Sequence, residues 1–535
     1  MDTLNTQQQR AVEAGDGPLI IVAGPGTGKT KTLTARISYL ISSGRAKPGD
    51  ILALTFTKKA AQEMAERVGN PEVTLCTFHA LCQRLLGGEH AFVMEPERLA
   101  IVKSLPRPAE LKGVSVRELG LLISRVKNKV KESADVAKIA AAYTAELERR
   151  GLCDFDDLLL KARKLLQEEP AKRPSYRYIL VDEFQDTNAL QYEILQLIRG
   201  NDNVFVIGDP NQSIYAFRGA SGTIFEQFER DFPDAARITL TTNYRSSPEV
   251  VAVSNVVFPG TAELRARSNV AGQVRAVEVL NEYSEANWVV SEIQRAVGGA
   301  DMLQGSVDEA HHSLRDFAIL YRNRKTATVV QKYIAESGLP FQIVGEGSPY
   351  ERADIQELIG MLRAAHEQNV AKASPAAAAQ RLAEQAGLDS KEVHQFLSTL
   401  VRFATLPEAL THLDRIAEDH FYDPAAEAVT LLTIHASKGL EFSRVFIVGV
   451  EEGTLPHKKA DEQEERRLFY VAVTRAKEQL DILHARRRAG ENATVSRFVG
   501  ELPPSLLPRL TDPQLATDQR RAQKRHAKRA QISLF

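Results

Sequence analysis

Short runs of apolar residues recur along the chain, separated by longer stretches in which apolar residues repeat with helical spacing. Continuous short apolar runs are typical of strands that are buried on both faces of a parallel sheet. Alternation of such strands with amphipathic helices predicts an α/β fold. The predicted strands lie at residues 18–22, 51–55, 73–77, 178–181, 204–208 and 238–243, and then at 274–280, 317–321, 341–344, 429–434 and 445–448.

Two helical stretches interrupt the strand pattern. Residues 87–151 are rich in charged residues, and residues 350–428 are rich in alanine. At 535 residues the chain is too long for one core, so we expect two α/β domains with parallel sheets, each carrying a mainly helical insertion. The first domain is predicted at 1–86 and 152–247, the second at 248–349 and 429–502, and a flexible basic tail at 503–535.

The composition is that of an ordinary globular protein, with 43% hydrophobic and 26% charged residues. A net charge of -1 gives no overall attraction to nucleic acid, so any basic binding surface has to be local. Few cysteines and the lack of an apolar run near the ~20 residues of a membrane span predict a cytoplasmic protein with no membrane contact. Cys76, His79 and Cys82 lack a fourth zinc ligand at finger spacing, so we expect packed thiols.

A glycine-rich loop joins the first predicted strand to a helical pattern and reads Ala23, Gly24, Pro25, Gly26, Thr27, Gly28, Lys29, Thr30. Backbone N–H groups and the positive end of the helix can surround a polyphosphate, while Lys29 reaches its terminal groups and the Thr30 hydroxyl binds Mg2+. Ala23 stands where the general pattern has glycine. A plain structural turn is the alternative, but this spacing favours a nucleotide site.

Paired acids follow the predicted strand at 178–181. Asp182 can hold a Mg2+ ion, and Glu183 can orient and deprotonate an attacking water, which would turn nucleotide binding into hydrolysis. After the strand at 204–208, Gln212 is placed to sense the γ-phosphate, while Tyr215, Phe217 and Arg218 in the same loop face a polymer.

Other aromatic and basic residues follow predicted strands and suit base stacking and phosphate contact. Phe56 precedes Lys58 and Lys59, and His79 lies in a similar turn after the next strand. Aromatic packing beneath a loop is the alternative for Phe56. Lys127, Lys129 and Lys131 form a basic patch in the first insertion, either a solvated face or a contact with nucleic acid.

In this order, the segments AGPGTGKT, TFTKKAAQEM, TFHAL, VDEFQDTN, GDPNQSIYAFRGA, NYRSS, HASKGLEF and YVAVTRAK resemble the UvrD/Rep/PcrA family of superfamily 1 DNA helicases. The resemblance extends from residue 4 to residue 477 and includes alanine at the start of the phosphate loop. It implies two RecA-like domains with ATP and Mg2+ as cofactors. Single-stranded DNA and 3′-tailed duplex DNA are the implied substrates, in bacterial replication or repair.

The resemblance also implies roles for individual residues. Gln8 would read adenine, Tyr244 would stack on it, and Glu441 would contact the ribose side. Arg245 and Arg475 would be arginine fingers that complete the site only when the cleft between the domains closes. The implied single-strand track comprises Phe56, His79, Tyr215, Phe217, Arg218 and His435, with Phe217 at a position where better-known members have Trp.

The second insertion is much shorter than the corresponding subdomain of large family members. Translocation from 3′ to 5′ along a single strand is therefore better supported than processive unwinding. The alternative is a clamp-tethered, single-strand DNA-binding ATPase switch that displaces proteins without unwinding. An RNA helicase is less favoured, because no feature reads a 2′-hydroxyl.

The tail is basic between residues 520 and 529 and ends in Gln531-Ile532-Ser533-Leu534-Phe535. This ending resembles the bacterial peptide that binds the sliding clamp, in which a glutamine is followed three residues later by Leu-Phe. A clamp contact would raise the local concentration of the protein on replicating DNA. The alternative is a tail that folds back on the protein.

Overall fold

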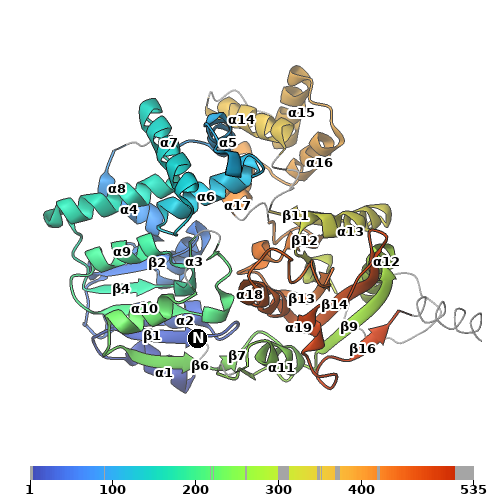
Figure 1. Cartoon of the computed structure of the whole chain (residues 1–535), viewed down its shortest axis with the longest axis horizontal. Coiled ribbons are helices and arrows are strands. Elements are labelled where there is room, and N and C mark those ends of the chain that lie inside the picture. The colour runs from blue at the N-terminus through green and yellow to red at the C-terminus, as the bar shows by residue number, and fades with distance from the viewer. Residues whose placement is uncertain are drawn as a thin grey trace, which may run out of the picture. The chain divides into compact units, whose positions relative to one another are not determined.

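The structure is a computed structural model that describes residues 4–88, 91–216, 219–220, 222–259, 262–298, 312–345, 350, 352–367, 374–418 and 422–512. The chain divides into two compact units. The first comprises Met1–Arg245 with Gly260–Arg267, and the second comprises Ser246–Pro259 with Ser268–Phe535. Each unit contains its own large sheet with its own buried core (Figure 1).

The first unit is built on a six-stranded sheet in the order β3-β2-β4-β5-β1-β6, and every neighbouring pair is parallel. The strands are β1 (Leu19–Ala23), β2 (Ile51–Thr55), β3 (Thr74–Thr77), β4 (Tyr178–Val181), β5 (Val204–Gly208) and β6 (Ala236–Leu240). Strands β2, β4 and β5 are buried at every position, which is why their sequences are continuous apolar runs. A separate short pair joins β7 (Thr242–Asn243) to β8 (Arg265–Ala266).

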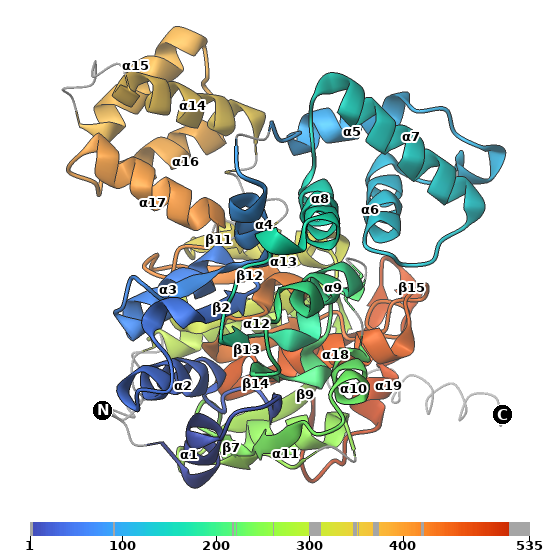
Figure 2. The same cartoon turned by 90° about the vertical axis from the view of Figure 1, so that its left-hand side faces the viewer.

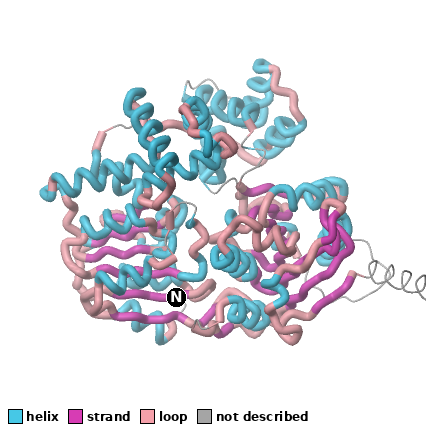
Figure 3. The backbone as a smooth tube through the Cα atoms, in the orientation of Figure 1, coloured by secondary structure: helices cyan, strands magenta, loops and turns pink. Residues whose placement is uncertain are grey.

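Helices cover both faces of this sheet (Figure 3). One face packs against α1 (Thr6–Glu13), α2 (Lys29–Ser42) and α3 (Lys58–Val68). The other face packs against α4 (Phe78–Leu86), α8 (Phe155–Glu168), α9 (Ala189–Ile198) and α10 (Ile224–Asp231). Cys76 and Cys82 lie in this second core as packed thiols, and burial raises the pKa of Cys82 to about 12.

The first insertion is helical, as the sequence predicts, and has a separate hydrophobic core. It contains α5 (Glu95–Ser104), α6 (Val116–Lys127) and α7 (Ala134–Arg150), which Figure 2 shows beyond α8. The chain leaves the insertion just before α8, where the backbones of Cys153 and Phe92 pair in an isolated β-bridge.

The second unit contains an eight-stranded sheet in the order β11-β12-β10-β13-β14-β9-β16, with β15 paired antiparallel to β14. The strands are β9 (Gln273–Asn281), β10 (Phe317–Tyr321), β11 (Phe341–Val344), β12 (Val429–Thr433), β13 (Phe442–Val448), β14 (Ala476–Arg488), β15 (Glu491–Asn492) and β16 (Arg509–Thr511). Except for β15, the neighbouring strands are parallel.

Two features of this sheet differ from the sequence-based predictions. Strand β14 was not predicted, because its many charged residues hide the apolar positions that face the core. The predicted tail also begins too early, since β16 pairs with β9 and Leu507 is fully buried. Residues 503–512 therefore belong to the second unit rather than to a flexible tail.

The helices of the second unit include α11 (Pro248–Val257), α12 (Glu282–Ala296), α13 (Arg324–Glu336), α18 (Glu462–Val473) and α19 (Arg497–Gly500). Its insertion is also helical and contains α14 (Ala353–Glu367), α15 (Pro375–Ala386), α16 (Lys391–Leu400) and α17 (Leu406–Glu418) around a core of their own. Across the described part of the chain, none of the helices combines the length and apolar character needed to span a bilayer.

Candidate active site

The phosphate loop occupies the turn between buried strand β1 and the first residue of α2. Gly26 and Gly28 have positive φ angles of 68° and 82°, a conformation that side chains disfavour. A Cβ atom on Gly26 would lie 2.6 Å from Cβ of Arg245, and one on Gly28 would lie 2.7 Å from Nε2 of Gln8. Glycine is therefore required at both positions by conformation and by space.

Hydrogen bonds to its carbonyl groups fix the shape of this loop. Thr27 Oγ1 donates to the Gly24 carbonyl at 2.8 Å, and Asn243 Nδ2 donates to the Pro25 carbonyl at 2.8 Å. The Tyr244 N–H donates to the Gly26 carbonyl, also at 2.8 Å. The loop is thus held before a ligand binds, which lowers the ordering cost of binding a polyphosphate at the N-terminus of α2.

Gln8 braces the same loop. It is 1% exposed, its Nε2 donates to the Thr27 carbonyl at 3.0 Å, and its Oε1 accepts from the Asn5 N–H at 3.0 Å. Both ends of the amide therefore contact the protein, a role that the sequence did not predict. Recognition of adenine by Gln8 stays a prediction.

A pocket of about 410 Å³ adjoins the loop within the first unit, lined by Leu4, Asn5, Gln8, Gly26, Gly28, Lys31, Tyr244 and Arg267. The Tyr244 side chain is 40% exposed, and its hydroxyl accepts a hydrogen bond from Asn5 Nδ2 at 2.8 Å. The Arg267 guanidinium lies 5.9 Å from the centre of the Tyr244 ring. An exposed aromatic face beside the loop is the feature that base stacking uses. Stacking of adenine on Tyr244 stays a prediction.

The two predicted acids lie at the end of β4. Glu183 has a φ of 48°, a strained conformation for a residue with a side chain, and such strain is often found at functional positions. The Lys29 ammonium lies 4.0 Å from Glu183 Oε1, so the lysine of the phosphate loop and the predicted base are neighbours. Gln185 donates a hydrogen bond to the other oxygen of Glu183 and thereby orients its carboxylate.

Asp182 is buried beside this pair. Its pKa is raised to about 7, chiefly by burial and then by the Glu183 charge, while the Lys29 charge opposes both effects. Burial also raises the pKa of Asp209, again opposed by Lys29. Three carboxyl groups therefore surround one lysine, and an added divalent cation would relieve their repulsion.

The residues fit Mg2+ in their chemistry. The Asp182 carboxylate and the Thr30 hydroxyl, in the first turn of α2, offer the hard oxygen ligands that Mg2+ prefers, and Mg2+ usually keeps several waters beside one or two carboxylates. When bound with a nucleotide, the ion would neutralise charge on the phosphate oxygens. Asp182 and Thr30 would hold it.

Gln212 is connected to Glu183 through other polar side chains. Its Nε2 donates to Asp209 Oδ2 at 2.8 Å, and the Asp209 N–H donates to Gln185 Oε1 at 3.0 Å. Gln185 in turn donates to Glu183. A continuous polar chain thus runs from the predicted γ-phosphate sensor to the predicted base, all within the first unit.

Arg245 lies beside the phosphate loop within the first unit, since a Cβ atom on Gly26 would lie 2.6 Å from its own Cβ. Its role as an arginine finger that completes the site on domain closure stays a prediction. The short β7 explains this position: Asn243 holds both Pro25 and the Arg245 N–H, the latter at 2.9 Å. The Arg245 backbone is therefore anchored to the phosphate loop itself.

Arg475 belongs to the second unit and lies between Thr474, the C-cap of α18, and the first residue of β14. Its guanidinium donates to the carbonyl groups of Val471 and Leu440, each at 2.9 Å, and to Thr474 Oγ1 at 3.1 Å. Glu441 pairs with Lys477 at 2.9 Å. The roles predicted for Arg475 and Glu441 toward a nucleotide stay predictions.

Aromatic residues of the predicted DNA track form two clusters. The rings of Phe56 and Tyr215 stack with centroids 5.2 Å apart, at an interplanar angle of 16°. His79 contacts Phe155 edge to face at 5.7 Å. His435 lies in the second unit, at the start of a short 3-10 helix, and is partly buried. Phe217 and Arg218 lie outside the described residues.

Phe155 is a candidate DNA contact that sequence reasoning missed. It is 62% exposed, lies at the first position of α8, and stacks on Phe92 with ring centroids 5.2 Å apart. A large aromatic residue between two aspartates, where a helix begins, was a usable signal. Nothing in the sequence, however, linked it to His79.

The predicted lysine patch is not a single surface. Lys127 is buried and pairs with Asp154 at 2.8 Å and with Asp157 at 2.7 Å, while Lys129 pairs with Glu193. Lys131 is exposed. The interpretation as one basic patch is therefore wrong, because carboxylates distant in the sequence neutralise two of its members.

Comparison with known proteins identifies the family. A model described as the UvrD/REP helicase N-terminal domain matches residues 4–112 and 108–233, and one described as the UvrD-like helicase C-terminal domain matches residues 238–375 and 383–487. The chain belongs to the UvrD/Rep helicase family. Its two parallel sheets are the RecA-like helicase domains of that family, as the sequence resemblance implied.

Curated relatives extend this UvrD/Rep assignment over nearly the whole chain. The ATP-dependent DNA helicase PcrA of Bacillus subtilis is 29% identical over 666 residues, covering 98% of this chain and 89% of that protein. PcrA of Staphylococcus aureus is 30% identical over 647 residues, covering 95% of this chain and 87% of that protein. Both alignments are longer than the 535 residues present here, so parts of each relative face no residue of this chain.

Proposed function

We propose that this UvrD/Rep protein is an ATP-dependent DNA helicase that moves 3′ to 5′ along single-stranded DNA, in bacterial cytoplasmic DNA replication or repair. The observation that carries the proposal is the position of Glu183. It lies 4.0 Å from the lysine of a glycine-fixed phosphate loop, in the same unit as the exposed and stacked aromatic residues. One rigid sheet therefore carries both an ATP hydrolysis site and a surface for bases.

Hydrolysis in this proposal divides the polar groups by role. Lys29 and the loop N–H groups bind the β- and γ-phosphates, and Arg245, whose Cβ lies beside Gly26, adds a further cation. Glu183 accepts the proton of the attacking water, held in orientation by Gln185. Arg475 supplies a second cation from the other RecA-like domain when the two domains close on ATP.

The route from the γ-phosphate to DNA passes through one loop. Gln212 reaches Glu183 through Asp209 and Gln185, and Tyr215 follows Gln212 closely in the chain. Tyr215 stacks on Phe56, so a base that inserts at this pair would shift the loop that carries Gln212. Loss of the γ-phosphate would in turn change the contacts that Tyr215 and Phe56 make with DNA.

A clamp-tethered ATPase switch that displaces proteins without unwinding is the second candidate. It is favoured by the length of the alignments with PcrA, which exceed this chain, and by the break at 376–382 in the match to the C-terminal family model. That break falls in the proposed second insertion at 350–428. The proposed clamp contact uses Gln531, Leu534 and Phe535, which lie outside the described residues.

Strand displacement measured on a 3′-tailed and a 5′-tailed duplex, with ATP, separates the two candidates. DNA-stimulated ATP hydrolysis is followed in parallel, and Glu183→Gln serves as the catalytically disabled control. We expect unwinding of the 3′-tailed duplex only, and no unwinding by the control. Strong DNA-stimulated hydrolysis with neither duplex opened would favour the switch, and opening of the 5′-tailed duplex alone would reverse the proposed direction.

A further inference from the structure

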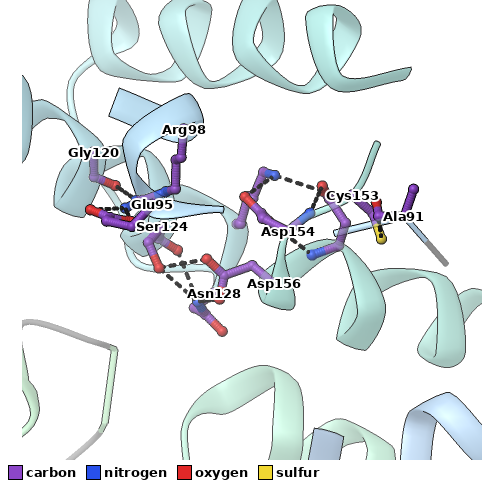
Figure 4. A network of polar contacts seen from close by, with 11 residues as sticks. Ala91, Glu95, Arg98, Gly120, Ser124, Asn128, Cys153, Asp154 and Asp156 are labelled. Atoms are coloured by element: carbon purple, nitrogen blue, oxygen red, sulfur yellow. Dashed lines mark hydrogen bonds and ion pairs between the residues drawn. The ribbon is translucent and has the colours of Figure 1, made fainter. Parts of the chain in front are cut away.

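A chain of hydrogen bonds connects the first insertion to the start of α9. Figure 4 shows the part of it that joins Ser124, Asn128 and Asp156. The centre of this hydrogen-bond chain is Asn128, the C-cap of α6, which is 2% exposed. Asn128 Nδ2 donates to Asp156 Oδ1 at 2.7 Å, and Asn128 Oδ1 accepts from Asn188 Nδ2 at 2.8 Å. Ser124 Oγ donates to the other oxygen of Asp156 at 2.6 Å. The nucleotide chemistry described above makes no use of these contacts.

The chemistry of its two neighbours fixes the orientation of the Asn128 amide. Asn188 is the N-cap of α9, and its Oδ1 accepts from the Gln191 N–H at 2.8 Å, so only its Nδ2 can point toward Asn128. At the other end, both oxygens of Asp156 accept hydrogen bonds, Oδ1 from Asn128 Nδ2 and Oδ2 from Ser124 Oγ. The central residue must therefore present one acceptor and one donor, which an amide does and a carboxylate does not.

The same residue contacts three segments with functional roles. Asn188 ends the loop that begins with Asp182 and Glu183, and Asp156 is the neighbour of Phe155 in the first turn of α8. The third segment is the turn after Tyr215. There Gly219 has a φ of 83°, and a Cβ on it would lie 3.1 Å from Cβ of Asn128.

The turn after Tyr215 is also bonded to Asn188 through its backbone. The Ala220 N–H donates to the Tyr215 carbonyl at 3.2 Å, and Ala220 forms a backbone bridge with Asn188. The acid-bearing loop and both groups of proposed DNA contacts therefore meet at a single buried amide.

We propose that Asn128 is a positioning residue that couples single-stranded DNA bound at Phe155 and Tyr215 to the acidic loop ending at Asn188. The inference rests on the proposed function, since it concerns the stimulation of ATP hydrolysis by DNA. A base stacked on Phe155 fixes the start of α8, and Asp156 passes that constraint to Asn128. Asn128 then holds Asn188, and with it the loop on which Glu183 faces the phosphates.

The test is Asn128→Asp, which keeps the size of the side chain but faces the Asp156 carboxylate without a donor. We expect ATP turnover with saturating single-stranded DNA to fall about tenfold, a size common for coupling between sites. DNA-free turnover and DNA affinity should change less than about twofold. Ser124→Ala is the matched control, because it removes a hydrogen bond to the same carboxylate without involving Asn188, and it should leave the stimulation unchanged.

A rescue distinguishes coupling from a general loss of structure. In the double variant Asn128→Asp with Asp156→Asn, the amide and the carboxylate exchange places, and both links through position 128 can form again. The bonds from Asn128 Nδ2 to the carbonyl and hydroxyl oxygens of Ser124 are not restored. We expect the DNA stimulation to recover most of its wild-type value.

A second variant tests the Asn188 end of the hydrogen-bond chain and remains informative if Asn128→Asp does not fold. Asn188→Asp keeps an N-cap for α9 but has no donor for Asn128, so it should reduce the stimulation to a similar extent. Wild-type stimulation in both single variants would overturn the inference and leave the proposed function intact. A wild-type protein that DNA does not stimulate would overturn the proposed function and, with it, the inference.

Discussion

Several residues in this protein have structural roles that their residue type alone does not reveal. Gln8 holds the phosphate loop by donating to the Thr27 carbonyl, and Arg245 lies beside Gly26 of the same loop. Glu183 adopts a left-handed backbone conformation at the end of a buried strand, which turns its side chain toward Lys29. In each case the neighbour that defines the role lies far away in the sequence.

Phe155 gives the most direct test of the DNA surface. Phe155→Ala should weaken binding of single-stranded DNA by about 1–3 kcal/mol, or roughly 5- to 150-fold in Kd, because base stacking on an exposed ring is worth that much. Fluorescence anisotropy with a labelled oligonucleotide measures this change. Phe155→Trp, which keeps a stacking surface, should retain most of the affinity, and equal binding by wild type and Phe155→Ala would exclude Phe155 from the DNA track.

Glu285 predicts a pH dependence of stability. It is fully buried in α12, where Arg488 is shared between Glu285 and Glu451, and burial raises the pKa of Glu285 to about 7 despite that guanidinium. The folded state therefore binds a proton that the unfolded chain releases near the ordinary glutamate pKa of 4.5. The stability contributed by this group is full below about pH 4.5 and is lost as the pH rises toward 7.

Urea unfolding at several pH values checks this sign. Glu285→Gln should flatten the fall in stability between about pH 4.5 and 7 relative to wild type. A wild-type protein and variant with parallel stability curves would show that Glu285 does not titrate in this range.

At the scale of elements, buried charges anchor the first insertion. Lys127 ends α6 with its side chain 4% exposed, and it bonds to both Asp154 and Asp157 at the start of α8. Its ammonium also lies 4.7 Å from the centre of the Tyr143 ring on α7. The Lys127 ammonium therefore joins α6, α7 and α8 at the end of the insertion.

Removal of this cation should be costly. Lys127→Met should lower the free energy of unfolding by about 3–5 kcal/mol, because two buried carboxylates lose their counter-charge. Lys131→Met, at an exposed position nearby, should change stability by no more than about 0.5 kcal/mol. Chemical denaturation of both variants measures the difference, and similar midpoints would mean that the buried pairs contribute little.

At the scale of the whole molecule, the cores are separate. Each parallel sheet packs its own apolar residues, and each helical insertion adds a further core. Separate cores allow parts of a chain to move as rigid bodies, which a motor driven by ATP requires. Because the net charge is only -1, DNA has to be attracted by local basic surfaces rather than by the electrostatic field of the whole protein.

The end of the chain carries a prediction at this scale. Leu534→Ala with Phe535→Ala should abolish binding to a purified bacterial sliding clamp in isothermal titration, because the apolar pair is the proposed docking element. ATP hydrolysis stimulated by DNA should stay unchanged, since the proposed active-site residues lie far from this segment in the sequence. Ser533→Ala is the matched control and should bind like wild type. Clamp binding that survives the double substitution would place the contact elsewhere.

Local patterns were enough to predict much of this protein. The two parallel sheets, the glycine-rich phosphate loop and the helical insertions are encoded in contiguous stretches, where apolar runs, glycines and helical spacing act over short distances. The acids Asp182 and Glu183 could be assigned because they directly follow a buried strand, and parallel strands bring such ends to one edge of a sheet. The family resemblance then implied a role for each of these segments.

Other features depended on residues brought together from distant parts of the chain. Asn243 holds Pro25 from 218 residues away, and Asn188 reaches Asn128 across 60. From the sequence, Lys127 is expected to be a surface charge, but in the fold it is buried between two aspartates. Likewise, the residues of β16 are expected to belong to the tail, but in the fold they pair with β9. A local pattern reports which side chains prefer burial or water, whereas the partner that each one meets is set by the path of the chain between them.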